Sequence, residues 1–155
     1  MPFVKVNKAY TRIFLTDYST AWTAAFDAVS MGRDIIRLQN RELGIIETGW
    51  VDYTDQKHFL EVFSDEHFFL RARYRLKVQL REGKKNGQPA VITQVLREEQ
   101  LERTFLAGWT DSDEAESTVE ATVLYRIGRI IAIQEKNDKQ AAVAAEKNDA
   151  EIKQN

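Results

Sequence analysis

The sequence contains no cysteine among its 155 residues. This absence excludes disulfides, thiol catalysis and cysteine-ligated metal within the chain. Long apolar runs are also missing: none approaches the roughly 20 residues that a membrane-spanning helix needs, and the opening MPFVKVNKAY lacks the apolar core of a signal peptide. The net charge of −2 gives no general attraction to nucleic acid or to anionic membranes.

Recognisable catalytic patterns are missing as well. The sequence has no Ser-His-Asp set, no glycine-rich phosphate loop and no paired-carboxylate motif. Its two histidines, His58 and His67, share one polar segment, but their spacing matches no compact metal-ligand motif such as HExxH. The acids Asp111 and Asp113 are explained by capping of a helix that follows them. We therefore expect a protein that is not an enzyme and that has no metal or cofactor.

What the chain does contain is enough for one folded domain. Hydrophobic residues make up 43% of the chain, and eight Phe, five Tyr and three Trp can fill a core. A chain of this size buries roughly two thirds of the surface that its unfolded form exposes. The apolar pattern stops after Gln134, where a segment rich in Ala, Lys and Glu follows. We expect a domain over residues 1–134 and a disordered or frayed tail over residues 135–155.

Two helices are predicted inside this domain. The first spans Tyr18–Met31, because Asp17 is a good N-cap and an apolar stripe follows at helical spacing. The stripe consists of Trp22, Ala25, Phe26 and Val29. The second runs from Asp113 to about Gln134, where Asp113 and Glu116 resemble a capping box.

Strands are predicted between and before these helices. Alternating apolar residues and turn signals indicate strands over Ala9–Leu15, Asp34–Leu38, Ile45–Tyr53 and Phe68–Arg81. Asn86-Gly87 is the centre of a hairpin turn. The chain then returns either as two strands or as one long strand. The two alternatives are Ala90–Leu96 followed by Glu102–Ala107, and Ala90–Phe105.

The resulting order is β-α-β-β-β-β-α, with a further strand in one of the alternatives. Antiparallel strands joined by hairpins, with helices on one face, define an α+β domain. A long final helix lying across a curved antiparallel sheet is the helix-grip arrangement. Thr54–Glu66 is the least regular stretch, and we expect a helical turn or a packed loop there.

A row of positive charges lies on one face of the strand Phe68–Arg81. Its members alternate with apolar residues and are Arg71, Arg73, Arg75, Lys77 and Arg81. If the hairpin loop has four residues, Arg73 lies opposite Glu98 and Lys77 opposite Gln94, which neutralises part of the row. The row is a solvated face, or a platform for an acidic protein, nucleic acid or anionic lipid. We expect no exposed aromatic side chain between these charges.

The three tryptophans divide into two kinds. Trp22 lies on the apolar stripe of a helix and is expected in the core. Trp50 and Trp109 lie at a strand end and in a loop, where exposure allows tryptophan to anchor a partner. The candidate partner-binding residues are therefore Trp50, Trp109, Arg71, Arg73, Arg75 and Lys77.

Three segments of the chain resemble the repeated domain of the BamC lipoprotein family (NlpB type). They are DYSTAWTAAFDAV in the first helix, GIIETGWV from Gly44 to Val51, and LYRIGR from Leu124 to Arg129 in the closing helix. The resemblance covers roughly residues 10 to 134. It implies a helix-grip domain of an outer-membrane lipoprotein that faces the periplasm and makes protein–protein contacts, as an accessory to β-barrel assembly. This sequence contains neither the lipidation cysteine nor the second domain that are found in that family.

Two other functions remain open at this point. A helix-grip carrier would hold a small apolar ligand in an enclosed cavity lined by Trp22, Phe26, Tyr74 and Ile127. A nucleic-acid or acidic-partner binder would use the basic face from Arg71 to Arg81. The resemblance favours a protein partner in the cell envelope over both.

Overall fold

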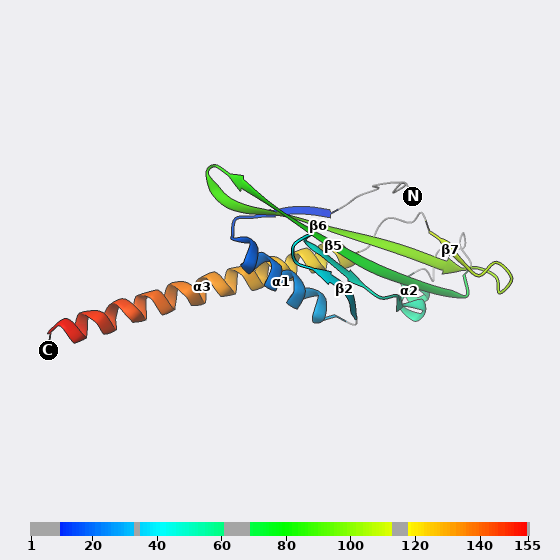
Figure 1. Cartoon of the computed structure of the whole chain (residues 1–155). Coiled ribbons are helices and arrows are strands. Elements are labelled where there is room, and N and C mark those ends of the chain that lie inside the picture. The colour runs from blue at the N-terminus through cyan, green and yellow to red at the C-terminus, as the bar shows by residue number, and fades with distance from the viewer. Residues whose placement is uncertain (1–9, 33–34, 61–68, 113–117, 155) are drawn as a thin grey trace.

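The computed structural model describes residues 10–32, 35–60, 69–112 and 118–154. In these residues the chain forms an antiparallel sheet with helices, an α+β fold (Figure 1). The strands are β1 (Tyr10–Phe14), β2 (Ile36–Asn40), β3 (Ile45–Thr48), β4 (Val51–Asp52), β5 (Arg71–Lys85), β6 (Gln88–Glu102) and β7 (Trp109–Asp111). The helices are α1 (Tyr18–Ser30), α2 (Thr54–Leu60) and α3 (Thr118–Gln154).

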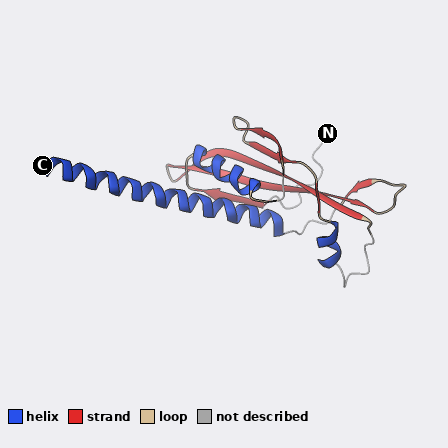
Figure 2. Ribbon diagram, turned by 90° about the horizontal axis from the view of Figure 1, so that it is seen from below, coloured by secondary structure: helices blue, strands red, loops and turns tan. Residues whose placement is uncertain are grey.

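The strand order is β1-β6-β5-β3-β2, with β4 beside β5 and β7 beside β6. Helices α1 and α3 pack together on one face of the sheet (Figure 2). The main core lies between them and the hairpin. It joins Trp22 and Val29 of α1 to Leu76 and Val78 of β5 and to Ile127 of α3. The predicted α+β class and the predicted apolar stripe of the first helix are both confirmed.

Helix α1 begins as its sequence predicts. The backbone N–H of Thr20 donates to Asp17 Oδ1 at 2.9 Å, so Asp17 is the N-cap. Hydrogen bonds from the side chain and then the backbone of Thr20 favour the charged carboxylate and lower the pKa of Asp17. The N-cap matters because the first turn of a helix has backbone donors without partners inside the helix.

The β5–β6 hairpin is the longest strand pair. Asn86 and Gly87 have φ values of 52° and 76°, and they form a two-residue turn at the predicted centre. The strand after the turn is the single long β6, so a separate strand over Glu102–Ala107 is wrong. The four-residue loop is wrong as well, because the true turn shifts the register by two residues. The observed pairs are Arg73 with Gln100, Arg75 with Glu98 and Lys77 with Leu96.

Two predicted boundaries change for local reasons. The strand expected over Ile45–Tyr53 is divided into β3 and β4. The irregular stretch after it begins with α2, which Asp52 starts by accepting hydrogen bonds from the backbone N–H and the hydroxyl of Thr54 at 2.9 and 2.6 Å. The rest of that stretch, with His67, lies outside the described residues.

The C-terminal segment is a helix where we expected a disordered or frayed tail. Helix α3 continues through Gln154, and its last part extends away from the sheet (Figure 1). Ala, Glu, Lys and Gln are strong helix formers, and extending an existing helix costs less than starting one. From Ala132 on, the described side chains are exposed, as the missing apolar stripe predicts. The expected capping box at Asp113 and Glu116 lies outside the described residues.

No helix in the described part of the chain is both long and apolar enough to cross a membrane.

Candidate functional site

Most of the predicted partner-binding residues meet on the face of the sheet opposite α1 and α3. The buried apolar residues of β5 point towards the helices, so Arg71, Arg73 and Arg75 point to the other face. Trp50 precedes β4 and reaches this face from one side of β5. Trp109 begins β7 and reaches it from the other side, beyond β6.

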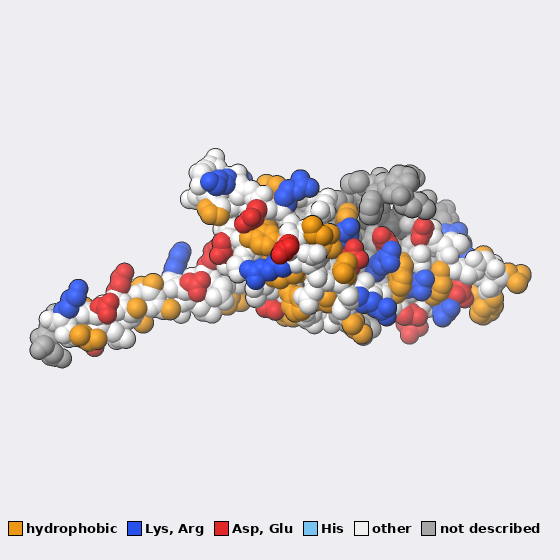
Figure 3. Space-filling view, in the orientation of Figure 1, with side chains coloured by type: hydrophobic (Ala, Val, Ile, Leu, Met, Phe, Trp, Pro, Cys, Tyr) orange, Lys and Arg blue, Asp and Glu red, His pale blue; other side chains and the backbone are white. Residues whose placement is uncertain are grey.

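The guanidinium groups and the indole rings alternate. The Arg73 guanidinium carbon lies 4.4 Å from the ring centroid of Trp50 and 4.1 Å from that of Trp109. Arg75 lies 4.6 Å from the Trp50 ring, and Arg71 lies 4.9 Å from the Trp109 ring. We call these five residues the Arg–Trp ladder. Figure 3 shows basic and hydrophobic side chains side by side over this end of the molecule.

The ladder overturns the expectation that no aromatic side chain lies between the charges. Trp50 is 23 residues from Arg73 in the sequence, and Trp109 is 36 residues away. Only the pairing of β4 with β5 and of β7 with β6 brings them together. Both indoles remain partly exposed. Cations over indole faces are attracted to the electron-rich ring, so the stack holds the arginines and the tryptophans in defined positions.

The outer arginines of the ladder are paired with carboxylates of β6. Arg71 Nη2 lies 2.6 Å from Glu102 Oε2, and Arg75 Nη2 lies 2.6 Å from Glu98 Oε2. The hydrogen bond to Glu102, reinforced by its charge, raises the pKa of Arg71. The predicted cross-strand neutralisation is therefore present, with partners set by the two-residue turn.

The central arginine has a neutral partner. Arg73 donates from Nε and Nη2 to Gln100 Oε1, at 3.0 and 2.6 Å. Partial burial lowers the pKa of Arg73, and the neighbouring charges of Arg71 and Arg75 lower it further. Arg73 stays charged at any ordinary pH, and its charge is the least compensated in the ladder.

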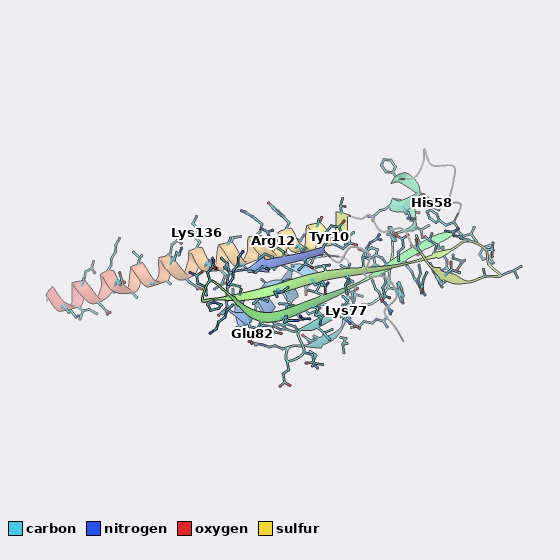
Figure 4. The ribbon with its side chains drawn as sticks, turned by 90° about the horizontal axis from the view of Figure 1, so that it is seen from above. Tyr10, Arg12, His58, Lys77, Glu82 and Lys136 are labelled. Atoms are coloured by element: carbon cyan, nitrogen blue, oxygen red, sulfur yellow. The ribbon has the colours of Figure 1, made fainter. Side chains whose placement is uncertain are left out.

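Lys77 lies on the same face but outside the ladder. Its Nζ is 3.8 Å from Glu47 Oε1 of β3. Figure 4 shows Lys77 between Glu82, near the hairpin turn, and His58 of α2. The structure therefore brings five of the six predicted binding residues into one stack and places the sixth farther along β5.

The local charge of this face is close to balanced. The basic row from Arg71 to Arg81 contributes +5, and five carboxylates on neighbouring strands contribute −5, which leaves 0. These carboxylates are Glu47, Asp52, Glu98, Glu102 and Asp111. A polyanion would gain little from such a face, since binding to phosphates depends on excess positive charge.

The helix side of the same end of the sheet holds a buried charge network, which the sequence analysis missed. Lys57 Nζ of α2 lies 3.1 Å from Glu99 Oε1, and Arg97 Nη1 lies 2.8 Å from Glu99 Oε2. Arg97 Nε lies 3.0 Å from Glu120 Oε1 of α3. The Tyr53 hydroxyl also donates to Glu99. All four charged side chains are buried, so the network fixes α2 and α3 on β6.

One sequence signal could have revealed this network. Arg97 and Glu99 occupy successive inward positions of β6, where apolar residues were expected. One of the two alternatives for this stretch ends the strand at Leu96, just before these charges. A continuous strand with charges pointing inward would instead have predicted buried ionic partners on the covering helices.

The remaining candidate sites are accounted for more simply. His58 stacks on Phe69, with ring centroids 4.1 Å apart. Within the described residues, no group of three or more His, Asp and Glu side chains is arranged to hold a metal ion. An open hollow of about 780 Å³ lies beside Tyr18 and Leu43, at the opposite end of β5 from the ladder.

The comparisons with known proteins add no identification. No protein-family model matches the chain, and no curated protein matches it significantly.

Proposed function

We propose that this chain is a non-enzymatic protein-interaction domain whose contact surface is the Arg–Trp ladder. The observation that carries this proposal is the placement of Trp50, just before β4, and Trp109, at the start of β7, on either side of Arg73. None of the described helices covers the sheet face that they share. Tryptophan and arginine are the residue types most often responsible for binding energy at protein interfaces.

The fixed positions of the ladder side chains support this role. Binding costs entropy when flexible side chains must be fixed. The stacking and the hydrogen bonds of Arg71, Arg73 and Arg75 fix these long side chains before a partner arrives. The charge-balanced face suits a protein with both polar and apolar groups.

Nucleic acid is the second candidate, and the interleaved indoles favour it, because bases stack on aromatic side chains. The balanced local charge argues against it. A titration with single-stranded DNA or RNA at low and high salt distinguishes the two. We expect no affinity that falls steeply as salt rises.

A carrier of apolar ligands has less geometric support. Trp22 and Ile127 are buried members of one core cluster, and Phe26 and Tyr74 pack against it. The open hollow beside Tyr18 and Leu43, and another along the exposed part of α3, are lined by other side chains.

The proposed compartment is the cell envelope, with a lipid anchor outside this sequence. Its support is the resemblance of residues 10 to 134 to BamC-type domains. Reading the coding sequence upstream of Met1 for a signal peptide and a lipidated cysteine tests this part directly. An upstream stop codon with no such segment would contradict it.

Affinity capture from an extract of the source cells tests the binding surface. The bait proteins are the unaltered chain, Arg73→Ala, Trp109→Ala and Arg81→Ala. Arg81 is the matched control, because it lies on the same strand and face but beyond the ladder. We expect specific partners to be lost with Arg73→Ala and Trp109→Ala and kept with Arg81→Ala. Equal recovery by all four baits would overturn the proposal.

A further inference from the structure

The loop between β6 and β7 carries the two most exposed large hydrophobic side chains of the described residues. Leu106 and Phe105 have relative exposures of 101% and 85%. The loop projects beyond the sheet at the end opposite the extended part of α3 (Figure 1), and hydrophobic side chains occupy that extremity in Figure 3. Nothing in the described part of the chain covers these two side chains.

The loop has a defined geometry. Pairing of Trp109 with Glu102 closes its base. Inside it, the backbone N–H of Ala107 donates to Thr104 Oγ1 at 3.1 Å, and Gly108 has a φ of +66° that allows the chain to turn back. The hydrogen-bonded turn therefore presents Phe105 and Leu106 outward at the end of the paired strands β6 and β7.

The groups behind the tip are basic and aromatic. Arg103 is exposed at the start of the loop, and Trp109 is partly exposed at its end. The Arg71 guanidinium stacks on Trp109, and Arg71 neutralises Glu102, the nearest carboxylate along the chain. From the tip inward, the order is thus apolar side chains, then a cation, then an indole.

This order matches the depth profile of a lipid bilayer surface. Apolar side chains enter the acyl boundary, while Arg and Trp reside at the level of the headgroups. We propose that Phe105 and Leu106 insert into the surface of a bilayer that carries anionic phospholipids. This proposal goes beyond the ladder's role in protein binding and does not depend on it.

A lipid surface fits the tip better than a pocket on a protein. The tip is convex and offers two large apolar side chains flanked by Thr104, Ala107 and Gly108. A specific protein interface buries about 800 Å² on each partner and requires a matching shape. A bilayer requires no matching concavity, and insertion of two side chains gives weak, reversible binding that a separate anchor would reinforce.

Co-sedimentation with phosphatidylcholine vesicles containing about 30% phosphatidylglycerol tests the proposal. We expect the unaltered chain to partition onto the vesicles. We expect roughly tenfold weaker partitioning for Phe105→Ser or Leu106→Ser alone, and roughly 100-fold weaker partitioning for both together. The control is Leu43→Ser, which removes an exposed leucine from a turn at the opposite end of β5 and should not change partitioning.

Fluorescence gives the depth of insertion. A Phe105→Trp variant should be quenched by vesicles whose phospholipids carry bromine on the acyl chains, and a Leu43→Trp variant should not. Absence of vesicle binding by the unaltered chain, or equal binding by the Phe105→Ser/Leu106→Ser variant, would overturn the proposal. If the tip binds a protein instead of lipid, the unaltered chain will fail to bind the vesicles, and the proposal is overturned in the same way. None of these outcomes affects the test of the ladder with Arg73→Ala.

Discussion

The two halves of the β5–β6 hairpin are held in place by different interactions. Near the turn, Val78, Leu80 and Val95 pack under α1 and α3 in a continuous apolar core. Towards the other end, the inward positions of β6 hold Arg97 and Glu99 in a buried charge network, beside a small second apolar cluster of Phe69, Ala72 and Leu101. The outward positions of β5 in that half hold the three arginines of the Arg–Trp ladder.

This difference separates stability from recognition. Apolar contacts have no preferred direction and depend on volume, so the near half can carry the folding energy of the domain. Buried ion pairs pay a desolvation cost that their attraction only partly recovers, but they require fixed geometry. The far half therefore positions side chains more than it stabilises the fold. Its outer face is also the face that we propose for binding.

The largest expected effect comes from breaking the buried network. Arg97→Met removes the cation beside Glu120 and leaves Lys57 as the neighbouring cation of Glu99, and we expect a loss of about 4 kcal/mol in the free energy of unfolding. Urea unfolding measures it. Arg81→Met, on an exposed position of the near half, should stay within about 0.5 kcal/mol of the unaltered protein. A loss below about 1 kcal/mol for Arg97→Met would show that the network is not structurally required.

Core truncation in the near half should cost somewhat less and leave recognition intact. Leu80→Ala removes a buried side chain of the main core near the turn, and we expect a loss of about 3 kcal/mol. Partner capture below the unfolding transition should be unchanged. If Leu80→Ala abolished capture while the protein remained folded, the proposed separation of the two halves would be wrong.

Removing one indole of the ladder should have a smaller effect on stability. Trp109→Ala deletes the ring between Arg71 and Arg73, and we expect a loss of about 1 to 2 kcal/mol, confined to the far half. Amide exchange should speed up in β7 and remain unchanged in α1. Uniformly faster exchange in both elements would contradict the confinement.

Loss of the α1 N-cap should cost about 1 kcal/mol at pH 7, as measured with Asp17→Ala by thermal or urea unfolding. The pKa of Asp17 is lowered in the folded protein, so its contribution is fully present above the unfolded value of about 4 and is lost as pH falls through the folded value. The difference between the two proteins should therefore shrink below about pH 4. A difference that did not depend on pH would indicate that the carboxylate charge is not involved.

The smallest effect is expected from deleting the extended part of α3. Truncation after Gln134 removes exposed helix and no core residue, so the free energy of unfolding should change by less than about 0.5 kcal/mol. Far-ultraviolet circular dichroism should show the loss of helix content. A large drop in stability would show that this segment packs on the domain.

Local signals in the sequence predicted the near half well. Asp17, the apolar stripe that follows it and the Asn86-Gly87 turn act over a few residues, and each was confirmed. The separate strand after Leu96 was wrong because charges pointing inward in β6 interrupt the alternation on which the prediction depended.

The candidate site was predicted as a set of residues but not as an arrangement. Trp50, Trp109 and the arginines of β5 were identified from exposure and alternation. Their stacking depends on β4 and β7, which are two and three residues long and too short to give a pattern. The sequence analysis misses the extension of α3 because it requires an apolar stripe for a stable helix, and residues 135–155 offer only high helix propensity.

Site-specific photo-cross-linking in the source cells tests the central claim most directly. A benzophenone amino acid placed at position 98 or 111 should yield adducts with a partner protein, since both positions are exposed beside the ladder and leave its two indoles in place. The same group at position 81, on that face but in the near half, should yield none. Adducts at position 81 with none at positions 98 and 111 would contradict the assignment of the Arg–Trp ladder as the binding surface.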